Sequence, residues 1–226
     1  MQMRAKGVIT ALQRDLLALF ASLPDQQYFY LTGGTALAEF YLGHRLSFDL
    51  DFFTSQDGLI QPFSYQLEKA CENHGCHVTV VRRFATFVQF TVDRGDESHK
   101  IDLALDSPFR FESTVQAEYG GYVNDFTDLK VDKLLAYFGR AEPRDAIDLH
   151  FLMQIEPLDV LLELAPQKDP GFDLYWFAVA LNRAKAFPDE LERWPVKMLM
   201  DVDPVALKQN FQSLAAEILS RLTSQV

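Results

Sequence analysis

The chain is poor in cysteine, with only Cys71 and Cys76 among 226 residues. Two thiols cannot supply the disulfide framework of a small secreted scaffold, so they indicate a reducing compartment. His74 and His77 lie beside them, but their spacing fits no usual zinc pattern, and no second ligand pair follows. We therefore expect neither a disulfide scaffold nor a zinc site.

Long apolar runs are also missing. No segment approaches the length of a membrane span. Arg14 and Asp15 interrupt the one apolar stretch near the N-terminus that could serve as a signal peptide. The composition, 48% hydrophobic and 13% aromatic, is ordinary for a globular protein with a substantial core. We expect a cytoplasmic protein with no membrane partner.

Positive charge is scarce, since 21 Lys and Arg residues face 32 Asp and Glu residues, a formal net charge of −11. This balance argues against a broad basic surface for nucleic acid but leaves room for a local basic groove. The chain also lacks internal repeats and low-complexity segments. Its length suits one large domain or two small ones.

The most informative stretch, residues 28–54, has the pattern of a strand, a glycine turn, a short helix and a second strand. An aromatic, strand-favouring run ends at Gly33 and Gly34. Thr35 can cap the helix that follows, and Gly43 can close that helix in the left-handed conformation. A backbone without Cβ atoms at a helix start can approach a phosphate closely and offer it N–H groups.

The second strand of this stretch is expected to begin near Leu46 and to alternate. One face would carry Phe48, Leu50 and Phe52, and the other Ser47, Asp49 and Asp51. Two carboxylates on one strand face repel unless a positive charge lies between them. Mg²⁺ fits this need, because it binds carboxylates together with phosphate oxygens. A glycine cradle next to metal carboxylates indicates phosphoryl or nucleotidyl transfer; the alternative is a plain turn with two solvated aspartates.

These residues resemble a known signature. Gly33-Gly34 followed by Asp49-Leu50-Asp51 is similar to the Gly-Gly, helix, Asp-x-Asp pattern of the polymerase-β-like nucleotidyltransferases. The fuller string, Gly33-Gly34-Thr35-Ala36-Leu37 with His44-Arg45-x-Ser47-x-Asp49-x-Asp51, resembles the AbiEii/AbiGii toxin branch of that superfamily. The gap between glycines and carboxylates is longer than in the commonest members of the superfamily but suits this branch.

A third carboxylate is expected on a later strand. Residues 100–105 alternate, with Ile101, Leu103 and Leu105 inward and Asp102 outward. In polymerase-β-like folds the third metal carboxylate stands in such an apolar-Asp-apolar setting. The resemblance therefore implies Asp102, with Asp106 on the same strand face as the substitute.

From about Thr127 the sequence pattern changes from that of strands to that of helices. An apolar stripe of Val131, Leu134, Leu135 and Phe138 is expected opposite a polar side with Lys130, Lys133 and Tyr137, in a helix ending at Gly139. Pro143 suits the first turn of the next helix. The run from Lys133 through Arg140 and Arg144 to Asp145 and Asp148 resembles the second conserved block of the AbiEii branch. The alternative is an exposed Arg144/Asp148 helix pair.

Further helices are expected over about 9–20, 61–74, 172–187 and 203–222, and two strands over 77–92 with a break near Arg82-Arg83. Those two arginines form either a phosphate-facing patch or a solvated turn. The resemblance implies an α+β, polymerase-β-like nucleotidyltransferase fold, a small mixed sheet flanked by helices, followed by a helical C-terminal region. We expect a catalytic domain over residues 1–125 and a helical domain over 126–226 that completes the site.

The resemblance also implies a function: metal-dependent nucleotidyl transfer of the bacterial toxin type, from a nucleoside triphosphate to an acceptor such as tRNA, another RNA or a protein. Mg²⁺ or Mn²⁺ would bind Asp49, Asp51 and Asp102, with Lys133 and Asp145 also catalytic. The implied nucleotide-binding residues are Gly33, Gly34, Thr35, Arg45, Ser47, Lys133, Arg144 and Asp148. A cognate antitoxin is an implied partner.

Two other functions have to be weighed. A binding module with the same fold and no catalysis is one, although all three carboxylates are present. An aspartate-nucleophile phosphatase is the other, because Asp49-x-Asp51 matches its Asp-x-Asp motif. The phosphatase motif requires a threonine two residues after the second aspartate, where this chain has Phe53.

Overall fold

The computed structural model describes residues 2–224. The chain divides into two compact units, one reaching Phe126 and the other starting at Thr127, and each is described by itself. The helices are α1 (Ala11–Ala21), α2 (Gly33–Ala36), α3 (Ile60–Asn73), α4 (Phe126–Arg140), α5 (Pro143–Leu152), α6 (Leu158–Lys168), α7 (Leu174–Arg183) and α8 (Pro204–Thr223). The strands are β1 (Tyr30–Thr32), β2 (Leu50–Thr54), β3 (His77–Arg83), β4 (Phe87–Arg94), β5 (Glu97–Leu105), β6 (Val115–Gln116) and β7 (Tyr122–Val123).

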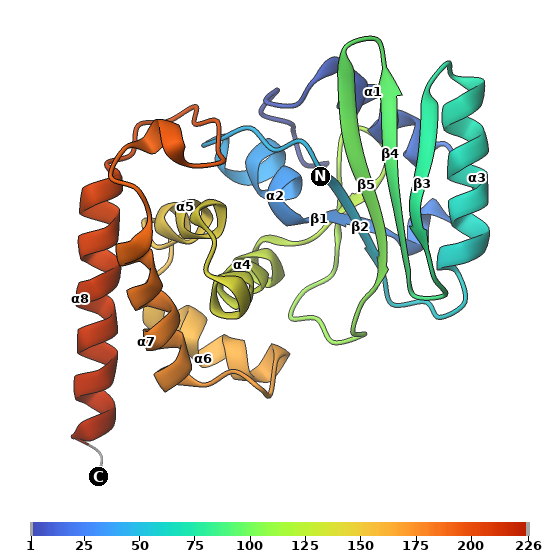
Figure 1. The fold of residues 1–226 in the computed structure, drawn as a ribbon. Coiled ribbons are helices and arrows are strands. Elements are labelled where there is room, and N and C mark those ends of the chain that lie inside the picture. Colours follow the sequence, from blue (N-terminus) through green and yellow to red (C-terminus); the bar gives the residue numbers. More distant parts are fainter. Residues whose placement is uncertain (1, 225–226) are drawn as a thin grey trace. The chain divides into compact units, whose positions relative to one another are not determined.

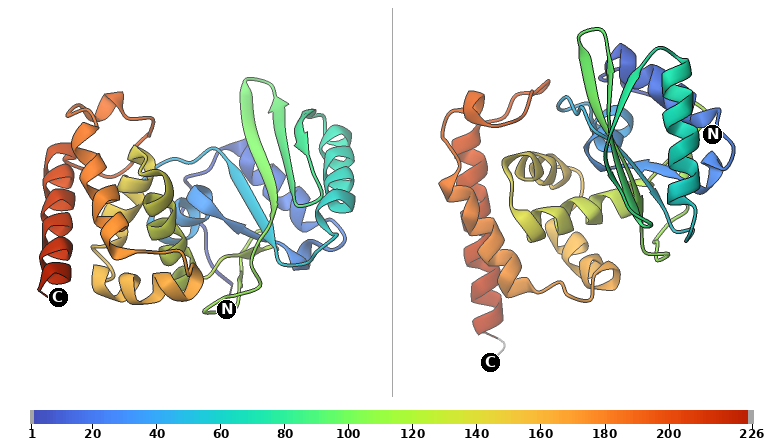
Figure 2. Two further views of the ribbon diagram at one scale, coloured as in Figure 1. Left: turned by 60° about the horizontal axis from the view of Figure 1, so that its bottom comes forward. Right: turned by 45° about the vertical axis from the view of Figure 1, so that its right-hand side comes forward.

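The first unit is built on one mixed sheet with the strand order β3-β4-β5-β2-β1-β7-β6. Figure 1 labels the five strands from β3 to β1. β2 lies between β1, to which it is antiparallel, and β5, to which it is parallel. β3, β4 and β5 form an antiparallel meander, in which the β4–β5 hairpin is the longest part of the sheet (Figure 2). The α+β fold with a small mixed sheet is as predicted.

Helices α1 and α3 cover one face of this sheet with aromatic packing. Phe20 of α1 stacks on Phe52 of β2, with ring centroids 3.6 Å apart. Phe63 of α3 lies 4.9 Å from Phe20 and 4.3 Å from Phe29. These rings bury large apolar areas, so they form the main hydrophobic anchor of the first unit.

The start of α1 is set by a capping box. Thr10 accepts a hydrogen bond from the backbone N–H of Gln13, and the Gln13 side chain accepts one from Thr10. The reciprocal pair satisfies two N–H groups that a helix start leaves open. The helix therefore begins at Ala11, two residues after the start that the apolar pattern predicts.

The structure differs from the expectation in residues 28–54. β2 begins at Leu50 rather than near Leu46, and Phe48 is exposed. Thr35 is inside α2 instead of capping it. The helix continues past Ala36 as a π-helix over Leu37–Leu42, and Gly43 ends it with a φ of +69°, the left-handed residue that the sequence predicts.

The second unit is helical, from α4 to α8. Tyr137 of α4 is fully buried, donates to the carbonyl of Ala180 in α7, and meets Phe211 of α8 edge to face at 5.2 Å. α4 runs through Arg140, past the Gly139 that was expected to end it. Ala141 then takes a φ of +48°, an uncommon conformation for a residue with a side chain.

Other predicted boundaries hold closely. α3 ends next to Gly75, whose φ is +76°, and Pro143 occupies the first turn of α5. Asp203 caps α8 by accepting from two backbone N–H groups. Among the described residues, no helix is long and apolar enough to cross a membrane.

The stacking of Phe20 on Phe52 predicts how two substitutions change the stability of the protein. Phe52→Ala should lower the free energy of unfolding by about 3–5 kcal/mol, because it opens a cavity beneath Phe20. Phe84→Ala removes the same atoms from a side chain that is 59% exposed and should cost no more than about 0.5 kcal/mol. Urea unfolding followed by circular dichroism measures both, and equal losses would contradict this account of the core.

Candidate active site on the carboxylate face of the sheet

Two of the predicted carboxylates are neighbours across a strand pair. Asp51 of β2 and Asp102 of β5 are register partners in the parallel β2–β5 pairing, so they lie on the same face of the sheet. Leu50 and Phe52 are buried on the opposite face, which α1 and α3 cover. The predicted alternation of this strand is therefore confirmed for residues 50–52.

Lys100 bridges Asp49 to Asp102. The Lys100 ammonium lies 3.3 Å from Asp49 Oδ2 and 3.2 Å from Asp102 Oδ2. Gln89 of β4 also donates to Asp102 Oδ1, at 2.9 Å. Burial alone would lower the pKa of Lys100, but the Asp49 and Asp102 carboxylates raise it above its ordinary value. Lys100 therefore stays charged at neutral pH.

The substitute third carboxylate lies elsewhere. Asp106 follows β5 and accepts a hydrogen bond from the Tyr30 hydroxyl. Asp102, by contrast, is held next to Asp51 by the strand register. Over residues 2–224, no three His, Cys, Asp or Glu side chains are grouped closely enough to hold a metal ion. Binding one at the Asp49, Asp51 and Asp102 set therefore requires side-chain rotation.

The glycine turn approaches this set directly. Gly33 has a φ of +70°, and a Cβ placed on it would overlap the Asp51 carboxylate. A Cβ on Gly34 would lie 2.7 Å from both Arg45 Nη2 and Ser47 Oγ. The absence of side chains at the two glycines thus brings Asp51, the Arg45 guanidinium and the Ser47 hydroxyl onto one turn.

Buried side chains from three elements hold the segment that carries Asp49. Each of three consecutive carbonyls, at residues 47–49, accepts one side-chain hydrogen bond. The donors are Gln13 Nε2 to Ser47 at 2.9 Å, His99 Nδ1 to Phe48 at 3.0 Å, and Thr35 Oγ1 to Asp49 at 2.5 Å. Sequence reasoning missed Gln13 and His99 and treated Thr35 as a nucleotide contact. No local pattern reveals these donors, because each acts across at least 14 residues of chain.

The charged residues of the second block form ion pairs within the second unit. Lys133 Nζ lies 2.8 Å from Asp148 Oδ2, and both side chains are buried. Arg140 binds Asp145 through two hydrogen bonds of 2.6 and 2.7 Å, a bidentate geometry. Arg144 instead contacts Glu142, at 3.0 Å.

The prediction of a polar side on α4 is wrong. Lys130, Lys133 and Tyr137 are all buried. The two lysines can be buried because each meets a carboxylate: Lys130 lies 2.6 Å from Glu156, as Lys133 lies close to Asp148.

Comparison with known proteins decides the family. The sequence profile of one family, described as "Nucleotidyl transferase AbiEii toxin, Type IV TA system", matches residues 14–221. The chain belongs to the AbiEii family. Both predicted blocks fall within the match, so this AbiEii protein is a nucleotidyltransferase of the toxin type. No curated protein matches the chain.

Solved structures share the fold of this AbiEii chain. MenT4, a nucleotidyltransferase toxin from Mycobacterium tuberculosis, aligns with a TM-score of 0.60 and 19% identity, covering 92% of this chain and 82% of its own. JHP933 from Helicobacter pylori aligns with a TM-score of 0.53 and 19% identity, covering 96% of each chain. At this identity the likeness shows the fold alone.

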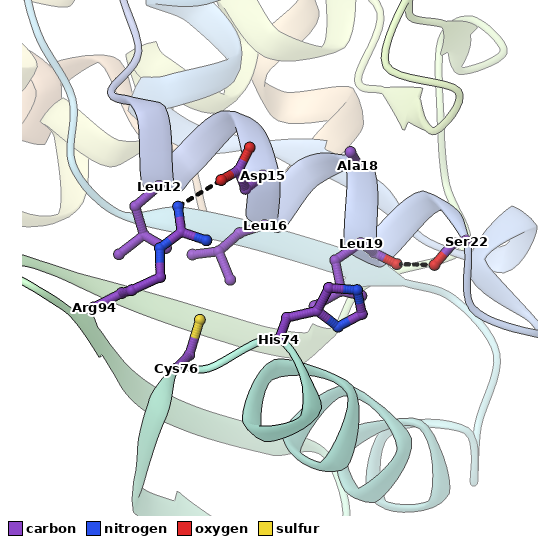
Figure 3. A pocket seen from close by; sticks show the side chains of 9 residues that line it. All are labelled: Leu12, Asp15, Leu16, Ala18, Leu19, Ser22, His74, Cys76 and Arg94. Atoms are coloured by element: carbon purple, nitrogen blue, oxygen red, sulfur yellow. Dashed lines mark hydrogen bonds and ion pairs between the residues drawn. The ribbon is translucent and has the colours of Figure 1, made fainter.

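A hollow of about 380 Å³ lies on the other face of the sheet of this AbiEii protein (Figure 3). It is bounded by α1, the end of α3 and β4, and Arg94 pairs with Asp15 at its rim. Burial raises the pKa of the Cys76 thiol that lines it, so the thiol is a poor nucleophile. Its lining includes none of the predicted site residues.

Gly33 provides a test of the turn. Gly33→Ala and Gly58→Ala both place a side chain on a left-handed backbone, at a cost of about 1–2 kcal/mol. Only Gly33 adds a clash, with Asp51, because nothing lies within 4 Å of a Cβ on Gly58. Thermal unfolding should show a larger fall in melting temperature for Gly33→Ala. Equal falls would mean that Asp51 moves aside freely.

Proposed function

We propose that this nucleotidyltransferase is metal-dependent and that Asp49, Asp51 and Asp102 hold Mg²⁺ or Mn²⁺. The observation that carries the proposal is the placing of Asp51 and Asp102 as register partners, with Asp49 joined to Asp102 through Lys100. Carboxylate oxygens are the donors that these hard cations prefer. When bound, the metal would neutralise phosphate charge and lower the pKa of an attacking hydroxyl.

The Lys100 ammonium group supports the proposal that a cation binds to these three carboxylates. An ammonium group lies within 3.3 Å of two of the three carboxylates, so the local field favours a positive charge at this point. Asp51 would have to turn from Gly33 toward Asp49 and Asp102 to join it.

The glycine turn is the proposed phosphate site. Arg45 and Ser47 lie beside Gly34, so a guanidinium, a hydroxyl and an unobstructed backbone meet at one place. These are the donors that bind triphosphate oxygens. Thr35, whose hydroxyl donates to the Asp49 carbonyl, would act by positioning Asp49.

An acceptor would reach the metal site along the face of the sheet opposite α1 and α3. The register places Asp51, Asp102, Gln89 and Arg82 in one row from the centre of the sheet to its β3 edge, where Arg82 is exposed. An arginine and an amide in this row suit the phosphates and hydroxyls of an RNA end. We propose tRNA or another RNA as acceptor, and an antitoxin as the regulatory partner that a type IV system implies.

We propose that residues 1–125 form the catalytic domain and that residues 126–226 complete its site. Lys133 would act on the triphosphate and be oriented by Asp148. Asp145 would orient Arg140, with which it forms a bidentate pair. Arg144 would contribute a further phosphate contact.

Transfer itself can be tested with labelled nucleoside triphosphates and total RNA. Asp49→Ala, Asp51→Ala and Asp102→Ala should each reduce Mg²⁺-dependent incorporation by about two decades or more, because each removes a metal ligand. Asp106→Ala serves as the matched control, since it also removes a carboxylate from the region of β5. Full activity in Asp102→Ala together with loss in Asp106→Ala would reverse the assignment of the third ligand.

Lys133 offers a second test. Lys133→Ala should lower triphosphate affinity or turnover by about one to two decades, through loss of a charge-assisted phosphate contact. It should also reduce stability, because it removes the buried ion pair between Lys133 and Asp148. Lys130→Ala is the control, since it removes a lysine that is similarly buried and paired. Equal activity losses in the two variants would show that Lys133 is only structural.

A further inference from the structure

Lys100 occupies the position where the proposed metal site needs positive charge. Its ammonium contacts one oxygen of Asp49 and one of Asp102, at 3.3 and 3.2 Å. It reaches them because it precedes Asp102 by two residues on β5 and therefore projects from the same face.

The same oxygens cannot serve both cations equally. Mg²⁺ binds carboxylate oxygens at about 2.0–2.1 Å, and an ammonium group on those oxygens would lie close enough to repel it. The Lys100 side chain is 37% exposed, and a flexible lysine can move its charge into water.

We propose that Lys100 is a built-in counterion, which holds Asp49 and Asp102 together in the metal-free protein and which a divalent cation must displace in order to bind. The inference rests on the proposed function, because it takes these carboxylates to be metal ligands. In this role Lys100 positions the Asp49 and Asp102 carboxylates, stabilises the metal-free fold and opposes metal binding.

This arrangement has two measurable consequences of opposite sign. Removing the ammonium leaves like charges facing one another, so the metal-free protein should lose stability. Removing it also frees both carboxylates for a divalent ion, so metal affinity should rise. A lysine that only stabilised the fold would produce the first effect without the second.

The test uses the full chain, with Mn²⁺ as the probe and electron paramagnetic resonance of free Mn²⁺ as the readout. Lys100→Met should tighten the dissociation constant for Mn²⁺ about three- to tenfold, the scale of two partly exposed ion pairs. In chelator its melting temperature should fall by about 2–4 °C. Lys100→Arg keeps the charge and should bind Mn²⁺ no more tightly than the unmodified protein.

Lys69→Met is the matched control, because it removes the same charge from an exposed position on α3 and should change neither quantity. Unchanged or weaker Mn²⁺ binding in Lys100→Met would overturn the inference. If Asp49→Ala abolishes Mn²⁺ binding while Lys100→Met leaves it unchanged, only the counterion role fails. If the unmodified protein and Lys100→Met both bind no Mn²⁺, the proposed metal dependence fails with it.

Discussion

The stacking of Phe52 on Phe20 determines which face of the sheet carries the carboxylates. Side chains alternate along a strand, so burying Phe52 beneath α1 obliges Asp51 to face the other way. A register shift of one residue would bury the carboxylate and expose the ring. The parallel pairing with β5 then brings Asp102 next to Asp51. The geometry of the candidate site is thus a consequence of hydrophobic packing on the opposite face.

The segment before β2 depends on polar contacts instead. Residues 47–49 lie outside any strand, and side chains from α1, α2 and β5 bind their three carbonyls. Because these donors are buried, each hydrogen bond is protected from competition with water. Asp49 and Ser47 therefore occupy defined positions although they belong to a loop, which is what a site built partly on loops requires.

Local patterns predicted the parts of this protein that depend on local physics. The period-two alternation of residues 50–52 and the left-handed Gly43 follow from neighbouring residues alone, and both are present. The polar side expected for α4 was wrong, because a lysine paired with a carboxylate can be buried. The partner of Lys133 is Asp148, 15 residues later, and the partner of Lys130 is Glu156, 26 residues later. The carbonyl contacts made by Gln13 and His99 had no local signal either. The family resemblance, and no spacing rule, suggested Asp102 as the carboxylate that accompanies Asp51, and the structure pairs the two residues in register.

The strand order also governs how this enzyme can be made by a ribosome. β1 carries the chain into the glycine turn, yet it pairs in parallel with β7, where Leu31 meets Val123. Asn124 closes that junction by donating to Leu31 and Thr32. Long-range pairings of this kind form slowly, and only after both segments have been synthesised. The nascent chain therefore cannot complete this sheet until β7, about 90 residues after β1, has emerged from the ribosome.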